Sequence, residues 1–165
     1  MSAEAFRPFV GLLIWGCRRD HGSFLSFQFG APHLTVREPI TPSAEVSPRV
    51  ARTLARRRVS MQGDWSLLVL NCDWFLEVDG KEFRSDLDDL SVVDEYMPSV
   101  DGQRFVSPEW MESEKVVTLN FDLGASLRLA PSSEADASDD DEQWAVYRAD
   151  RHYCSLKRSG QIVWG

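Results

Sequence analysis

Cysteine and histidine are the first side chains in this sequence whose spacing suggests chemistry. Cys17 and His21 are four residues apart, and His152 and Cys154 are two apart. Because positions i and i+2 of a strand share a face, His152 and Cys154 could reach one metal ion. No Cys-x-x-Cys pair or second close pair completes a tetrahedral set. The pattern favours buried cysteines beside surface histidines, so we predict no metal site and no cofactor.

The nucleophiles and acids form no recognisable catalytic set. Each cysteine, Cys72 included, falls in an apolar segment, where a thiol stays protonated and inert. His21 and His33 lie in turns without a recognisable partner, and no Gly-x-Ser-x-Gly elbow is present. Asp73 and Asp122 could serve as acids or bases if buried, but aspartates at strand ends more often cap turns. We predict no catalytic residue and a non-enzymatic protein.

Two runs of opposite charge are more prominent. The basic run lies within residues 49–58 and consists of Arg49, Arg52, Arg56, Arg57 and Arg58. The acidic run consists of Asp139, Asp140, Asp141 and Glu142. The two runs are either solvated loops or charged surfaces. As charged surfaces they either face opposite poles and make the molecule dipolar, or meet within one molecule or across a head-to-tail dimer. Exposed ion pairs of this kind steer association more than they stabilise a fold.

The elements that position these residues repeat once along the chain. Phe27-Gln28-Phe29-Gly30 matches Leu119-Asn120-Phe121-Asp122, and Asp64-Trp65-Ser66-Leu67 matches Gln143-Trp144-Ala145-Val146. A further aromatic residue lies nine positions beyond each tryptophan, at Trp74 and Tyr153. A repeat of this kind sets the architecture before any single motif does.

Most segments between the turns alternate with the period of two that is typical of half-buried antiparallel strands. We therefore predict a mostly β (α+β) chain, with pseudo-repeats at residues 11–84 and 102–165 in a single domain of residues 10–165. Two sheets with one apolar face each bury those faces against each other. The predicted fold is an antiparallel β-barrel, narrowly favoured, or two packed sheets from an internal duplication.

Three segments depart from the strand pattern. Residues 86–97 are predicted to form the one helix between the copies, capped by Ser85 and stopped by Pro98. Residues 38–58 contain three prolines and are predicted to be an exposed loop, with a turn of helix near residues 50–54. Residues 1–8 are predicted to be a frayed tail.

The composition limits the class of protein and its partners. With 165 residues, 43% hydrophobic content and six tryptophans, the chain is large enough for one well-packed core. A net charge of −8 disfavours nucleic acid, as does the lack of aromatic residues among the clustered arginines. Three scattered cysteines favour a reducing compartment, and the apolar residues 9–17 are too few to span a bilayer. We predict a cytoplasmic protein without nucleic-acid or membrane partners.

Four strings carry a resemblance to a known group of sequences. They are Gly63-Asp64-Trp65-Ser66-Leu67, Cys72-Asp73-Trp74, Phe121-Asp122-Leu123-Gly124 and Glu142-Gln143-Trp144-Ala145-Val146-Tyr147. The chain resembles a group of small uncharacterised bacterial proteins over most of residues 10–165. The resemblance implies a bacterial origin and a stand-alone domain, and it brings no assigned activity or site residues.

Two functional hypotheses follow. The first is a protein-binding module, possibly of the immunity type, in which Asp139, Asp140, Asp141 and Glu142 meet a basic protein partner. The alternative is a small β-barrel that binds an apolar ligand, with the cavity lined by Trp65, Trp74, Trp144 and Tyr153. The sequence leaves open whether the protein is a monomer or a homodimer.

Overall fold

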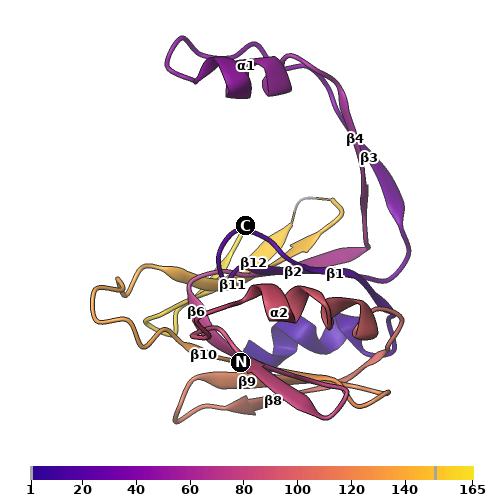
Figure 1. The fold of residues 1–165 in the computed structure, drawn as a ribbon, viewed down its shortest axis with the longest axis vertical. Helices are drawn as coiled ribbons and strands as arrows, with labels where there is room; N and C mark the ends of the chain where they lie inside the picture. The colour runs from indigo at the N-terminus through magenta and orange to yellow at the C-terminus, as the bar shows by residue number, and fades with distance from the viewer. Residues whose placement is uncertain (1, 151) are drawn as a thin grey trace.

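The computed structural model describes residues 2–150 and 152–165. Its strands form a sheet of six, a sheet of five and a separate two-stranded arm (Figure 1). In spatial order, the six-stranded sheet contains β1 (Ile14–Arg19), β2 (Leu25–Phe29), β5 (Trp65–Val69), β11 (Glu142–Arg148), β12 (Tyr153–Lys157) and β13 (Ile162–Trp164). The five-stranded sheet contains β7 (Lys81–Arg84), β6 (Cys72–Val78), β10 (Ser126–Pro131), β9 (Val116–Phe121) and β8 (Phe105–Met111).

The apolar faces of the two sheets share one core. Along β6 the buried residues alternate with more exposed ones, as a strand with one covered face requires. The rings of Phe29 on β2 and Phe105 on β8 meet edge to face between the sheets, with centroids 6.2 Å apart. All pairings are antiparallel, and neither sheet closes on itself within the described residues. The mostly β prediction is therefore confirmed, with two packed sheets, and the closed barrel is wrong.

Turn chemistry fixes several hairpins where the sequence predicted them. Asp79 and Gly80 join β6 to β7 with φ of 52° and 70°. These are the left-handed values that a two-residue hairpin of type I′ demands and that Asp-Gly adopts readily. The predicted break near residues 71–73 is also present, because β5 ends at Val69 in one sheet and β6 begins at Cys72 in the other.

The N-terminal segment belongs to the core. Residues Ser2–Phe9 form the 3₁₀ helix η1, which packs against β8. Side chains three apart in a 3₁₀ helix lie on the same side, so Phe6 and Phe9 both point inward and are fully buried. The rings of Phe9 and Phe29 stack with their centroids 4.7 Å apart, and the ring centroids of Phe6 and Trp144 are 4.9 Å apart. The expected frayed tail is wrong over residues 2–8.

The helix predicted at residues 86–97 is much shorter. Only α2 (Ser91–Asp94) and the 3₁₀ turn η2 (Met97–Ser99) form there. Ser85 does not cap a helix because it extends the sheet. Its backbone N–H donates to the Trp74 carbonyl oxygen at 3.0 Å, and its hydroxyl oxygen accepts from the Trp74 N–H at 3.1 Å. Asp89 instead accepts hydrogen bonds from the Ser91 backbone N–H and hydroxyl, which delays the helix. The expectation of one helix is also wrong, since the arm carries another.

The two halves of the chain have equivalent strand order once the arm is left out. In the first half, β1, β2 and β5 are neighbours in one sheet, and β6 and β7 follow in the other. In the second half, β8, β9 and β10 are neighbours in one sheet, and β11 and β12 follow in the other. Trp74 on β6 and Trp144 on β11 hold matching positions in this order. The sequence pattern had matched Trp144 with Trp65, which lies on the adjacent strand β5.

Candidate functional site

A long arm, residues 31–63, projects from the sheets (Figure 1). It consists of β3 (His33–Arg37) and β4 (Arg58–Gln62), which pair only with each other, and α1 (Pro48–Leu54) at the outer end. Leu34 lies opposite Met61, and Val36 lies opposite Val59. Because side chains alternate along a strand, these four share one face of the arm. The other face is polar and basic.

The apolar face of the arm is uncovered in the single chain. Its four side chains are between 47% and 68% exposed. The arm is one fifth of the sequence, yet it holds six of the thirteen exposed large hydrophobic residues in the described part of the chain. A lone two-stranded hairpin is marginally stable in water, and a continuous exposed apolar patch usually marks an interaction site. This face is the strongest candidate for a binding surface.

The end of the arm is ordered by its own hydrogen bonds. Ser47 caps α1 by accepting from the Val50 N–H at 3.4 Å, and Pro48 stands in the first turn, where no donor is needed. The Arg37 guanidinium donates to the carbonyl oxygens of Thr53, Leu54 and Arg56 at 2.9 to 3.2 Å. The predicted turn of helix in this segment is confirmed. Arg37 fastens that helix to β3.

Six arginines surround a hollow at the end of the arm. The cavity has a volume of about 350 Å³ and is lined by Arg37, Arg49, Arg52, Thr53, Arg56, Arg57 and Arg58. Arg57 pairs with Glu38 at 2.8 Å. Arg49, Arg52, Arg56 and Arg58 form no ion pair with any described residue. Like charges gathered this closely repel one another, so the cavity favours an anionic group.

The root of the arm is fixed on the six-stranded sheet. Asp64 accepts hydrogen bonds from the Ala31 N–H at 2.7 Å and pairs with His33 Nε2 at 2.5 Å. The His33 imidazole and the Ala31 N–H hold the pKa of the Asp64 carboxyl below its usual value. Trp15 Nε1 donates to the Gly30 carbonyl at 2.9 Å. Both ends of the arm are therefore tied where they leave the sheet.

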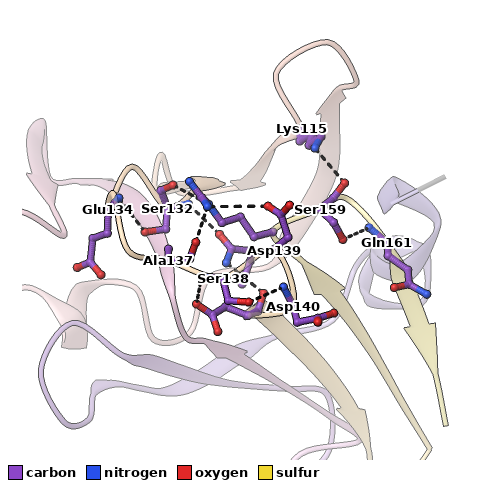
Figure 2. Close-up of polar contacts among 12 residues, drawn as sticks. Lys115, Ser132, Glu134, Ala137, Ser138, Asp139, Asp140, Ser159 and Gln161 are labelled. Carbon is purple, nitrogen blue, oxygen red and sulfur yellow. Dashed lines mark hydrogen bonds and ion pairs between the residues drawn. The ribbon is translucent and has the colours of Figure 1, made fainter.

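The acidic run lies in a loop between β10 and β11, apart from the arm (Figures 1 and 2). Lys157 pairs with Asp140 at 2.9 Å, and Arg158 lies 3.9 Å from Asp139. Arg158 also donates to the carbonyl oxygens of Ser132 and Ala137 at 3.2 and 2.6 Å. This arginine ties the loop to β12. Asp139 and Asp140 nevertheless remain 83% and 85% exposed.

The other two acids of the run have structural contacts. Asp141 Oδ2 accepts from the Ser138 N–H at 2.8 Å and closes a turn. Glu142 begins β11, where its carboxylate accepts from the Ser155 hydroxyl at 2.8 Å. Of the four acids of the run, only Asp139 and Asp140 are strongly exposed, and a basic side chain faces each of them. The loop therefore offers less free negative charge than its sequence suggests.

The four aromatic candidates separate into two groups. Trp74 and Trp144 are fully buried and fill the interior between the sheets. Trp65 and Tyr153 instead line a mostly apolar pocket of about 480 Å³ beside η1. Its other lining residues are Glu4, Ala5, Pro8, Val146, Arg148, His152, Cys154, Trp164 and Gly165. The structure thus brings together two of the four residues.

The cysteines and the remaining candidates do not converge. Burial raises the pKa of the Cys17 and Cys72 thiols and raises that of Cys154 to about 11, which leaves all three protonated. The described residues contain no group of three or more potential metal ligands. Asp73 and Asp122 accept hydrogen bonds from the backbone N–H groups of Ser133 and Arg104. Each of these hydrogen bonds joins segments that are far apart in the chain, so the two aspartates are structural contacts and not the local turn caps that the sequence favoured.

Sequence reasoning missed the uncovered apolar face of the arm. It recognised the short alternation in β3 and in β4 but assigned those apolar residues to the core. The available signal was the long segment between them, with three prolines and four arginines. A buried hairpin seldom carries so charged a connection, so the strands beside it belong outside the core.

No described helix is long and apolar enough to cross a membrane. The chain matches no protein-family model, and no curated protein or solved structure was found to be similar to it.

Proposed function

We propose that this chain is a non-enzymatic protein-binding module and that the arm is its binding element. The observation that carries the proposal is the uncovered apolar face formed by Leu34, Val36, Val59 and Met61. Covering such a face yields about 25 cal/mol for each Å² removed from water. A partner would supply this cover, since the chain's own sheets lie to one side of the arm's root.

The fold does not require the arm. At the matching point of the second half, β9 and β10 are joined directly by residues 122–125. We propose that the halves arose by internal duplication and that the arm is an insertion into the first copy. A segment that adds no core contact and exposes apolar side chains is better explained by binding than by stability.

The chemistry of the arm points to an acidic protein partner. The arm contains six arginines against two glutamates, a net charge of +4, whereas the rest of the chain has twelve basic and 24 acidic residues, a net charge of −12. No phenylalanine, tyrosine or tryptophan lies in residues 31–63, and the one imidazole, that of His33, pairs with Asp64, so the arm has no aromatic platform for nucleobases. The apolar face also suits a protein better than a phosphate backbone. Asp139 and Asp140 are proposed as a minor contact for basic groups.

Charges placed on the apolar face test the proposal. We expect Leu34→Asp combined with Val59→Asp to abolish stoichiometric capture of the partner by the immobilised chain, because burying two carboxylates is costly. Stability should change by less than about 0.5 kcal/mol, since both side chains are exposed. Leu123→Asp is the matched control, because this leucine is 74% exposed and lies outside the arm. Equal capture by all three chains would refute the proposal.

The apolar pocket favours a second candidate function, the binding of a small apolar ligand. Trp65 and Tyr153 line it, and Trp164 at its rim is 68% exposed. An apolar fluorescent probe should quench tryptophan emission in the intact chain and lose at least tenfold in affinity in Trp65→Ala. Trp110→Ala, which leaves the pocket unchanged, is the control. Probe affinity that is the same in all three chains would eliminate this candidate.

A further inference from the structure

We infer that the partner of the arm is a second copy of this chain, with the arginine-lined end of one arm seated on the acidic face of the other copy. This inference rests on the proposed function and names the partner. The acidic face is the surface of residues 77–95, which covers the β6–β7 hairpin and α2.

The acidic face has the charge that the arm lacks. Residues 77–95 contain eight acidic side chains, all exposed, and only two basic ones, Lys81 and Arg84. Phe83 on β7 contacts the Tyr96 ring after α2 at 4.7 Å, so hairpin and helix form one continuous surface. Asp86 pairs with Arg84 at 3.2 Å and Asp94 pairs with Arg19 at 2.7 Å, and the other six acids form no ion pair with a described residue. In the acidic loop, Lys157 and Arg158 pair with Asp140 and Asp139. The four unpaired arginines of the arm therefore have their best complement on this face.

The arrangement of the arm suits a two-fold contact between copies. Its apolar face lies between the root and the basic end, as the positions of β3, β4 and α1 show (Figure 1). Two arms that run antiparallel bring their apolar faces together and carry each basic end to the body of the other copy. Such a contact is self-complementary and closes at two copies. A single copy cannot make it, because its arm projects away from its own sheets.

In this dimer the apolar arm–arm contact forms once, across the two-fold axis, and the contact between a basic end and an acidic face forms twice. Each kind of contact has its own test. The intact chain should have twice the 18.7 kDa mass of one copy by light scattering after gel filtration. Leu34→Asp with Val59→Asp should be monomeric. The triple substitution Arg49→Glu, Arg52→Glu and Arg56→Glu in the arm should raise the dissociation constant of the dimer at least tenfold. The triple substitution Asp86→Lys, Asp88→Lys and Asp89→Lys on the acidic face should have the same effect.

Mixing the two charge-reversed chains is the decisive step. In the mixed dimer, one native arm meets a native acidic face, and the Glu-substituted arm meets the Lys-substituted face. Both contacts join opposite charges, so the dissociation constant of the mixed dimer should lie within about threefold of that of the intact chain. Glu112→Lys with Glu114→Lys, two exposed acids in the turn between β8 and β9, is the control and should dimerise like the intact chain. Circular dichroism confirms that each exposed substitution leaves the fold intact.

The outcomes separate this inference from the proposed function. A dimer that survives the arm substitutions, or mixed chains that stay monomeric, would overturn the inference. If the intact chain is monomeric but captures another protein through the arm, the second copy is wrong and the proposed function stands. If it is monomeric and captures nothing through the arm, both are wrong.

Discussion

Replacing Trp74 by alanine is expected to lower the free energy of unfolding by about 3–5 kcal/mol. Trp74 is fully buried between the two sheets, and its indole Nε1 donates to the Ser23 carbonyl at 2.7 Å. The substitution removes a large apolar side chain and leaves that carbonyl unpaired. Since small domains are stable by only about 5–15 kcal/mol, the loss is a large share of the total. Urea denaturation followed by circular dichroism measures it.

Trp144 provides the matched comparison. It is as deeply buried as Trp74, but its Nε1 has no hydrogen-bond partner among the described residues. Trp74→Phe removes the donor of a hydrogen bond, whereas Trp144→Phe removes a donor that has no acceptor. We expect Trp74→Phe to cost about 1 kcal/mol more than Trp144→Phe. Equal losses would show that the Ser23 hydrogen bond contributes nothing to stability.

Replacing Gly63 by alanine is expected to destabilise the protein by about 1–3 kcal/mol and to displace the root of the arm. A Cβ at this position would lie 2.5 Å from the Phe29 carbonyl oxygen, 2.8 Å from the Phe29 nitrogen and 2.9 Å from the Trp65 carbonyl oxygen. These are backbone atoms of two paired strands and cannot rotate away. Urea denaturation measures the stability, and binding through the arm should fall with it.

Gly124→Ala is the control for that prediction. A Cβ at Gly124 meets no atom within 4 Å, so the only penalty is the left-handed backbone, with φ of 98°. Gly124 lies in the turn between β9 and β10, outside the arm and outside residues 77–95. We expect a smaller loss of stability, of about 1 kcal/mol, and unchanged binding through the arm. Equal effects of the two substitutions on binding would show that close packing at Gly63 does not position the arm.

Local patterns were sufficient to predict single strands and hairpin turns. The alternation at Leu25, Phe27 and Phe29 and the turn at Asp79-Gly80 depend on neighbours in sequence, and the structure has both the strand β2 and this turn. Ser26 and Gln28 are buried as well, so β2 is not the half-buried strand that the alternation predicted. The helix at residues 86–97 failed because Ser85 bonds to Trp74, eleven residues away. Likewise, η1 is held by Phe29 and Trp144 through contacts that the composition of residues 1–8 does not reveal.

The candidate site was harder to predict than the fold. Val36 and Val59 have the same pattern as core strand residues, and only their pairing in an isolated hairpin leaves them exposed. Asp139 and Asp140 appear free in the sequence, but Lys157 and Arg158 reach them from the end of β12. Pairing between strands decides which apolar residues are covered and which charges are neutralised. A single sequence does not specify that pairing.

Amide hydrogen exchange in the arm tests the central claim most directly. The backbone N–H groups of β3 and β4 should exchange quickly in dilute protein, because nothing covers the apolar face of that hairpin. When the arm is bound, at high protein concentration or by an added partner, their exchange rates should fall at least tenfold. The N–H groups of β5 and β11 are the control and should exchange slowly under all conditions. Slow exchange in β3 and β4 in the dilute, monomeric chain, or no added protection in any complex, would contradict the account.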